Sequence, residues 1–188
     1  MRKVKLQMQM TINGYVGGLN GENNWMTWNP DDEFVEFLKS LLDTSDTLLL
    51  GRKTADGVIK HWENEADKNP AHPFAKKIAD ISKVVFTKTL DKSIWNNTTL
   101  AKGNLAEEIA DLKKQNGKDI IVFGGAAFVS SLIKEGLMDE YHLIINPTAM
   151  GNGMTIFNSL DRMQKFTPVQ AKLYSGGKTV LSFKAKND

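Results

Sequence analysis

The chain has 188 residues, of which 41% are hydrophobic and 24% charged, proportions expected of one globular domain spanning residues 1–188. A formal net charge of +2 is too small to indicate binding to nucleic acid or to an acidic membrane surface. The absence of cysteine excludes disulfides, thiolate metal sites and a cysteine nucleophile, and it is typical of a cytoplasmic protein. The sequence predicts neither a signal peptide nor a membrane-spanning segment.

The first segment, Val4–Ile12, alternates apolar and polar residues and predicts a half-buried strand. The glycine-rich stretch from Asn13 to Gly21 predicts a mobile loop. Trp25 and Trp28 lie at its far end. Exposed tryptophans are uncommon, so these side chains are expected either to fill the core or to line a pocket for a flat ligand. The run Asn29–Glu33 predicts a helix start, with a possible cap at Asn29.

Two short apolar strands run directly into glycine turns at predicted helix starts. Thr47–Leu50 leads into Gly51-Arg52-Lys53-Thr54, and Ile120–Phe123 leads into Gly124-Gly125-Ala126-Ala127. Glycine allows a sharp turn, and the positive end of the following helix favours phosphate. Arg52 is one of three arginines in the chain, and a guanidinium suits phosphate well. The alternative is that both turns bind nothing and Arg52 is an ordinary surface residue.

A third strand, Lys83–Lys88, ends in the donors Thr87 and Lys88. The polar residues 62–73 include two prolines and predict a loop. The remaining predicted elements are helices near 74–81 and 105–115, a helix following the Gly124–Gly125 turn, a strand at 141–146, and a hairpin of strands 169–174 and 179–184. This order predicts an α/β domain with a mixed sheet, in which the ends at Gly51, Thr87 and Gly124 share one edge. His61, His72 and His142 are too dispersed to indicate a metal site.

The order of these motifs resembles the dihydrofolate-reductase-like family. Within that family the chain is similar to the branch that contains the reductase domain of bacterial riboflavin biosynthesis. The resembling segments are Met10–Gly14, Leu50–Thr54, Val85–Lys88, Val122–Ala126, Asp139–Leu143 with Pro147, and Gly151–Gly153. The resemblance extends from Val4 to about Phe183. It implies a three-layer αβα fold with a central mixed sheet of about eight strands.

The resemblance also implies that the protein is an NADPH-dependent oxidoreductase. By this analogy, Arg52, Thr87 and Lys88 hold the adenosine 2′-phosphate. Backbone groups at Gly51, Lys53 and Thr54 and at Gly124, Gly125, Ala126 and Ala127 hold the pyrophosphate. The Asn13–Gly21 loop corresponds to the family's lid over the nicotinamide, which would exclude water during hydride transfer.

On the substrate side, the resemblance implies a flat nitrogen heterocycle bound near Trp25 and Trp28. Asp32 is the counterpart of the acid that orients and protonates the pterin in folate reductases, with Asp31 and Glu33 as competitors. The alternative substrate is a ribosylaminopyrimidine, as in riboflavin synthesis, which would require a second phosphate-binding patch. A different class of function is a non-catalytic nucleotide-binding protein. A homodimer is expected from the resemblance alone.

Overall fold

The computed structural model describes residues 1–186 and contains one eight-stranded sheet in the order β4-β3-β2-β5-β1-β6-β8-β7. The neighbours from β4 through β6 pair in parallel, whereas β8 pairs antiparallel with β6 and with β7. The predicted α/β fold with a mixed sheet and a final antiparallel hairpin is therefore confirmed. The strands are β1 (Val4–Thr11), β2 (Ser45–Gly51), β3 (Ser82–Phe86), β4 (Thr98–Ala101), β5 (Asp119–Gly124), β6 (Glu140–Asn146), β7 (Phe166–Leu173) and β8 (Thr179–Ala185).

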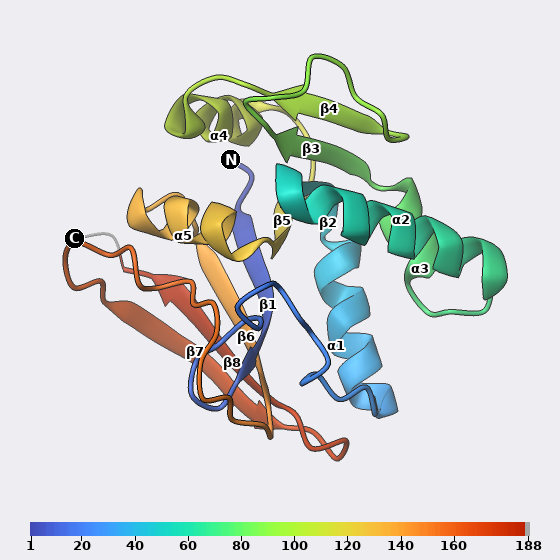
Figure 1. Cartoon of the computed structure of the whole chain (residues 1–188), viewed down its shortest axis with the longest axis vertical. Coiled ribbons are helices and arrows are strands. Elements are labelled where there is room, and N and C mark those ends of the chain that lie inside the picture. Colours follow the sequence, from blue (N-terminus) through green and yellow to red (C-terminus); the bar gives the residue numbers. More distant parts are fainter. Residues whose placement is uncertain (187–188) are drawn as a thin grey trace.

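Helices cover both faces of the sheet and give three layers (Figure 1). One hydrophobic cluster joins α1, α2 and α3 to one face, and a second joins α4 and α5 to the other. No helix within residues 1–186 has both the length and the apolar character needed to cross a membrane. The helices are α1 (Asp32–Asp43), α2 (Arg52–Lys68), α3 (Ala75–Asp80), α4 (Leu105–Lys114) and α5 (Ala126–Lys134).

The strand predicted at Val4–Ile12 is confirmed as β1, but it lies in the middle of the sheet, between β5 and β6, and is mostly buried rather than half-buried. Its polar residues Lys5, Gln7 and Gln9 alternate with buried apolar residues and therefore share one face. That face is turned toward α1, because Lys5 Nζ donates to Thr44 Oγ1 at the end of α1, at 3.2 Å. The alternation in β1 thus marks polar groups inside the molecule.

Two predicted boundaries around the first helices are also wrong. Helix α1 begins at Asp32 and is capped by Asp31, whose Oδ1 accepts the backbone N–H of Phe34 at 2.7 Å, so Asn29 is not the cap. Helix α2 continues to Lys68 and includes much of the loop predicted at 62–73. Trp62 packs edge-to-face against Phe74, with ring centroids 5.7 Å apart, and such tertiary packing stabilises a helix of polar composition.

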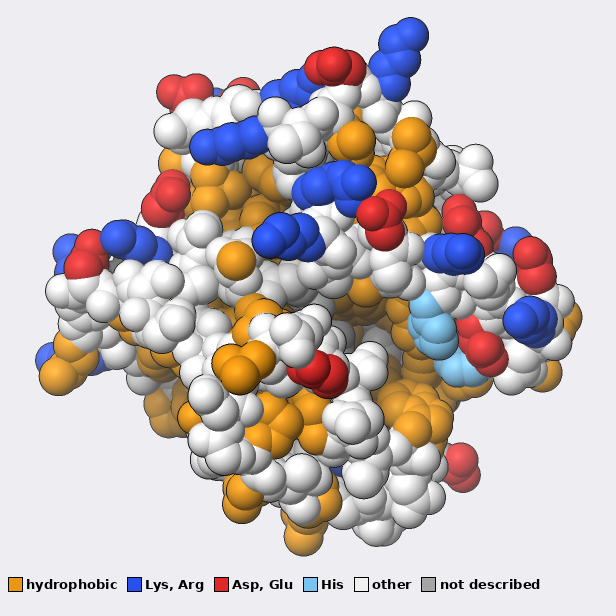
Figure 2. Space-filling view, viewed as in Figure 1, with side chains coloured by type: hydrophobic (Ala, Val, Ile, Leu, Met, Phe, Trp, Pro, Cys, Tyr) orange, Lys and Arg blue, Asp and Glu red, His pale blue; other side chains and the backbone are white. Residues whose placement is uncertain are grey.

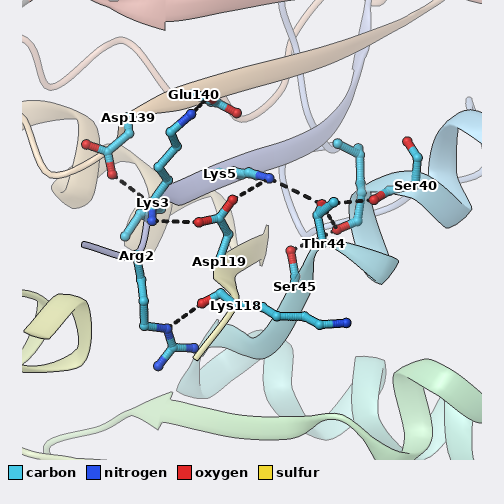
Figure 3. Close-up of polar contacts among 12 residues, drawn as sticks. Arg2, Lys3, Lys5, Ser40, Thr44, Ser45, Lys118, Asp119, Asp139 and Glu140 are labelled. Carbon is cyan, nitrogen blue, oxygen red and sulfur yellow. Dashed lines mark hydrogen bonds and ion pairs between the residues drawn. The ribbon is translucent and has the colours of Figure 1, made fainter. Parts of the chain in front are cut away.

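The amino ends of the parallel strands are joined by ion pairs (Figure 3). The Lys5 ammonium lies 2.6 Å from the Asp119 carboxylate, and the backbone N–H of Lys3 donates to the same carboxylate at 2.9 Å. Burial alone would raise the pKa of Asp119, but the hydrogen bond from Lys5, the backbone N–H of Lys3 and the charges of both lysines lower it below its ordinary value. Further pairs at this end are Arg2–Asp46, Lys3–Glu140 and Lys113–Asp139.

Candidate functional site

The carboxyl ends of the parallel strands meet at one edge of the sheet, as predicted. Gly51 at the end of β2 pairs with Phe86 of β3, which directly precedes Thr87. Leu50 pairs with Gly124 at the end of β5. The three predicted turns are therefore neighbours, at the edge where open α/β sheets bind their ligands.

Two of the helices that start at this edge, α2 and α5, have no side-chain caps. Gly51 is the N-cap of α2 and Gly125 the N-cap of α5, and neither helix start is capped by a side chain. By contrast, Asp31 caps α1 and Asn104 caps α4. The N–H groups of a first helical turn have no partner within the helix. The starts of α2 and α5 thus offer backbone donors to an anion, together with the positive ends of two helix dipoles.

The two turns touch each other, which explains why glycine is needed there. A Cβ atom at Gly51 would come 2.8 Å from Cβ of Phe128 in α5. A Cβ atom at Gly125 would come 2.1 Å from Oγ1 of Thr54 in α2. Side chains at these positions would force the two helix starts apart. Ala126 and Ala127 occupy the first turn of α5, and Ala127 is exposed.

A hollow of about 890 Å³, which we call the basic groove, lies between the starts of α2 and α4 and the ends of β3 and β4. Four predicted cofactor residues line it: Arg52, Lys53, Thr87 and Lys88. Thr87 is buried, and its Oγ1 accepts the backbone N–H groups of Thr89 and Leu90 at 3.1 and 3.2 Å. These bonds fix the turn after β3, so that Lys88 is presented on an ordered backbone.

Arg52 is held over the groove by two contacts. Its Nη1 pairs with the Asp56 carboxylate one turn further along α2, and its guanidinium carbon lies 5.4 Å from the centre of the Trp95 ring. Its Nε is buried and has no hydrogen-bond partner among the described residues. A buried guanidinium N–H without a partner is costly, and an anion bound in the groove would satisfy it.

A second hollow of about 670 Å³, which we call the aromatic hollow, opens on the α1–α2 face of the sheet. Its floor contains Gln7 and Gln9 of β1 together with Ile121 and Phe123 of β5, and Phe123 directly precedes the Gly124–Gly125 turn. Figure 2 shows histidine side chains beside hydrophobic ones around the hollow centre of this face. Its other lining residues are Asn23, Met26, Thr27, Trp28, Leu38, Leu41, Leu42, Val58, His61, Trp62, Glu65, Asn69, His72, Phe74 and Ile78.

Gln9 is oriented by a chain of hydrogen bonds that begins at a buried lysine. Lys178 Nζ donates to the side-chain oxygen of Asn146 and to the carbonyl of Thr27. Burial lowers the pKa of Lys178. Because an ammonium only donates, the Asn146 atom that faces Lys178 is the amide oxygen. Asn146 Nδ2 then points the other way and donates to Gln9 Oε1 at 2.8 Å. The NH₂ group of Gln9 is left as a donor at the floor of the aromatic hollow.

The other predicted substrate residues lie in different surroundings. Trp28 lines the aromatic hollow, packing edge-on against Phe74 with ring centroids 6.1 Å apart. Trp25 is buried outside it and donates its Nε1–H to the Glu22 carbonyl at 3.1 Å. Asp32 is exposed and lines neither hollow.

The competitors of Asp32 are engaged elsewhere. Besides capping α1, Asp31 accepts from Ser175 Oγ at 2.7 Å and from the backbone N–H of Gly176 at 3.0 Å. The bond from Ser175, followed by those from Gly176 and Phe34, lowers the pKa of Asp31. Glu33 is exposed and pairs with Lys172. The acids at the start of α1 thus have contacts outside the aromatic hollow.

The predicted lid is joined to the segment that follows β6. The N–H of Val16 donates to the carbonyl of Met154, and the N–H of Met154 donates to the carbonyl of Gly17, each at 2.8 Å. Gly17 and Met154 form an antiparallel bridge. Lid movement remains a prediction, and these bonds connect any such movement to the 150–154 segment.

Sequence reasoning missed most of the aromatic hollow. Gln7 and Gln9 lie in a strand for which the sequence predicts only half burial, and Trp62, Glu65 and His72 lie in the predicted loop at 62–73. The available signal was two glutamines at alternate positions of a strand otherwise rich in apolar residues. Their role becomes visible once β1 is placed at the centre of the sheet.

Comparison with known proteins identifies the family. The RibD C-terminal domain family matches residues 2–180. The chain is 32% identical over 176 residues to the uncharacterized protein YyaP of Bacillus subtilis (strain 168), covering 94% of this chain and 91% of that protein. It is similar in fold to a candidate riboflavin biosynthesis protein from Shewanella sp. PV-4, with a TM-score of 0.76 and 22% identity over 100% of both chains.

A longer protein shares the same fold. The bifunctional diaminohydroxyphosphoribosylaminopyrimidine deaminase/5-amino-6-(5-phosphoribosylamino)uracil reductase of Thermotoga maritima aligns with a TM-score of 0.69 and 15% identity, over 98% of this chain and 57% of that one. The resemblance to the riboflavin-reductase branch is thus confirmed. With a match over residues 2–180 and an eight-stranded mixed sheet of the same fold, the chain belongs to the RibD C-terminal domain family.

Proposed function

We propose that this protein is an NADPH-dependent reductase whose cofactor lies along the carboxyl edge of the sheet and whose substrate occupies the aromatic hollow. Membership of the RibD C-terminal domain family indicates an oxidoreductase. The observation that carries the cofactor proposal is the meeting of two uncapped helix starts beside Arg52, whose buried Nε has no partner among the described residues. This arrangement fits a ligand that bears several phosphates.

The phosphates of the cofactor are assigned to two places. In the basic groove, Arg52, Thr87 and Lys88 would hold the adenosine 2′-phosphate that distinguishes NADPH from NADH. The backbone N–H groups at the starts of α2 and α5 would hold the pyrophosphate, since Gly51 and Gly125 allow both helix ends to approach closely.

The bound cofactor supplies the hydride, and the protein supplies orientation and exclusion of water. The Gly124–Gly125 turn joins the cofactor edge to the aromatic hollow, because Phe123 lines that hollow and precedes the turn. Trp28, Trp62 and Phe74 would hold a flat nitrogen heterocycle between aromatic rings. The lid around Gly17 would cover the nicotinamide and exclude water.

Titration with NADPH and with NADH, followed by tryptophan fluorescence and calorimetry, tests the cofactor assignment. We expect NADPH to bind more tightly than NADH. We expect Arg52→Ala to weaken NADPH binding by about tenfold to a hundredfold, because a charge-assisted hydrogen bond to phosphate is lost, with little effect on NADH. Lys60→Ala is the matched control, since Lys60 is an exposed cation on the same helix.

Trp95 provides a local reporter because Arg52 stacks over its ring. In Trp95→Phe, calorimetry should still detect NADPH binding, while much of the fluorescence change should disappear. Equal affinity for NADPH and NADH, or an Arg52→Ala variant that behaves like Lys60→Ala, would contradict the assignment of the 2′-phosphate to the basic groove. NADPH binding without turnover of any heterocycle would instead favour a non-catalytic nucleotide-binding protein.

A further inference from the structure

The aromatic hollow contains no group suited to a phosphate. Among residues 1–186, the ionisable side chains that line it are Glu65, His61 and His72, and none of the lining residues is a lysine or an arginine. A phosphate monoester carries nearly two negative charges at neutral pH and is normally held by cationic side chains or free backbone N–H groups. In this hollow the phosphate would meet the Glu65 carboxylate instead, and like charges repel.

The two histidines belong to the aromatic wall of the hollow, and the His61 ring packs edge-on against Trp62 with centroids 4.9 Å apart. His72 Nδ1 faces the backbone N–H of Phe74 at 3.4 Å, which makes that nitrogen an acceptor. The His72 ring packs edge-on against Trp62 and Phe74, with centroids 5.5 and 4.6 Å away. An imidazole in this setting serves as part of the aromatic wall.

The floor of the hollow selects for a different group. Lys178 and Asn146 fix the Gln9 amide so that its oxygen is already bonded and its NH₂ group is available. A fixed amide donor on an apolar, aromatic-walled floor pairs best with a carbonyl oxygen or a ring nitrogen of a planar ligand. A ligand without such an acceptor would leave the donor without a partner.

From these contacts we infer that the substrate is an uncharged, unphosphorylated planar heterocycle with a carbonyl or ring-nitrogen acceptor that binds the Gln9 amide. This inference rests on the proposed function, since it takes the aromatic hollow as the substrate site. The inferred substrate differs from the phosphorylated ribosylaminopyrimidine named for the Thermotoga maritima relative.

A matched pair of ligands tests the charge preference. 5-Amino-6-(ribosylamino)uracil and its 5′-phosphate are titrated at one fixed neutral pH, together with pteridine-2,4-dione, under nitrogen and with Trp28 and Trp62 as fluorescent reporters. We expect the riboside to bind at least about tenfold more tightly than its phosphate. In Glu65→Gln this preference should shrink several-fold. Equal or tighter binding of the phosphate, or no binding of either unphosphorylated probe, would overturn the inference.

A substitution at Gln9 tests the donor. Gln9→Glu keeps the size of the side chain and the bond accepted from Asn146, but it replaces the free donor by an acceptor. We expect about tenfold weaker binding of pteridine-2,4-dione. Gln170→Glu, the same substitution at an exposed position of β7 outside both hollows, is the control and should have little effect. Equal effects of the two variants would overturn the role of Gln9.

The cofactor titrations keep this inference separate from the proposed function. Both Gln9→Glu and Gln170→Glu should bind NADPH as the unchanged protein does, which also shows that they are folded. If NADPH fails to bind but the unphosphorylated probes are still preferred, the reductase proposal falls and the ligand class of the hollow stands. If NADPH binds and the phosphorylated probe is preferred, the inferred ligand class of the hollow falls and the cofactor assignment stands.

Discussion

The two ends of the parallel strands satisfy their charges in different ways. At the amino end, basic side chains pair directly with carboxylates, as Lys5 does with Asp119. At the carboxyl end, Arg52 keeps one buried nitrogen without a partner among the described residues, and the starts of α2 and α5 have no side-chain caps. Groups that are already paired stabilise the fold, whereas unpaired groups are available to a ligand. The amino end of the sheet thus carries paired charges that stabilise the fold, whereas the carboxyl end carries the groups that we propose to bind the cofactor.

We expect the largest loss of stability from a substitution at the amino end of the sheet. Asp119→Ala removes the carboxylate beside Lys5, whose side chain is only 9% exposed, and leaves an ammonium with little access to water. We expect a loss of about 3 kcal/mol in the free energy of unfolding, measured with urea. NADPH affinity of the folded protein should not change. Asp91→Ala, which breaks the exposed pair with Lys102, is the control and should leave stability unchanged.

A smaller loss of stability is expected when a single methyl group is added at the carboxyl end of the sheet. Gly51→Ala places a Cβ atom 2.8 Å from Cβ of Phe128, so the starts of α2 and α5 must separate. We expect a loss of about 1–2 kcal/mol in stability from overpacking, together with a clear loss of NADPH affinity. Gly57→Ala on the same helix, where a Cβ meets no neighbour within 4 Å, should preserve both. Unchanged NADPH affinity in Gly51→Ala would show that the close approach of the two turns is not required.

The pH dependence of stability tests the contribution of the ion pair between Lys5 and Asp119. The pKa of Asp119 is lower in the folded protein than its ordinary value. Its carboxylate therefore contributes stability above the unfolded-state pKa of about 4, and this contribution is lost as the pH falls through the folded-state pKa. We expect the destabilisation caused by Asp119→Asn to be constant from about pH 7 to 5 and to shrink below about pH 4. A destabilisation that persists unchanged to acid pH would exclude the ion pair as its cause.

The smallest expected effects concern neighbouring acids at the start of α1. Asp31→Ala removes the helix cap and the bonds from Ser175 and Gly176, and should lower the thermal midpoint by about 2–4 °C. Asp32→Asn should leave the midpoint nearly unchanged, because Asp32 is exposed. The turnover of Asp32→Asn then tests the catalytic role predicted for this residue. A large loss of turnover at unchanged stability would support that role.

The sequence predicted those parts of the molecule that depend on short local patterns. The strand ends at Gly51, Thr87 and Gly124 were recognisable because a buried strand followed by a glycine or polar turn is a local signal, and the register confirms their proximity. Strand β4 was missed, since its four residues, Thr98–Ala101, are too few to show a period.

The parts that could not be predicted depend on contacts between distant residues. The continuation of α2 to Lys68 follows from the packing of Trp62 against Phe74, which polar composition conceals. The orientation of Gln9 requires Asn146 and Lys178, which come from two other strands or their ends. A pattern within one segment carries no information on such a chain of bonds. Most residues that line the aromatic hollow could therefore be identified only from the folded structure.

The buried Lys178 has a consequence for the order of folding. Its ammonium joins the carbonyl of Thr27 to Asn146, while the adjacent turn at Ser175 and Gly176 binds the cap of α1. During synthesis, the Gln9 amide at the floor of the aromatic hollow therefore cannot be fixed until the β7–β8 hairpin, which contains Lys178, has been translated. The proposed discrimination between ligands therefore depends on residues that are translated after most of the sheet that supports the hollow.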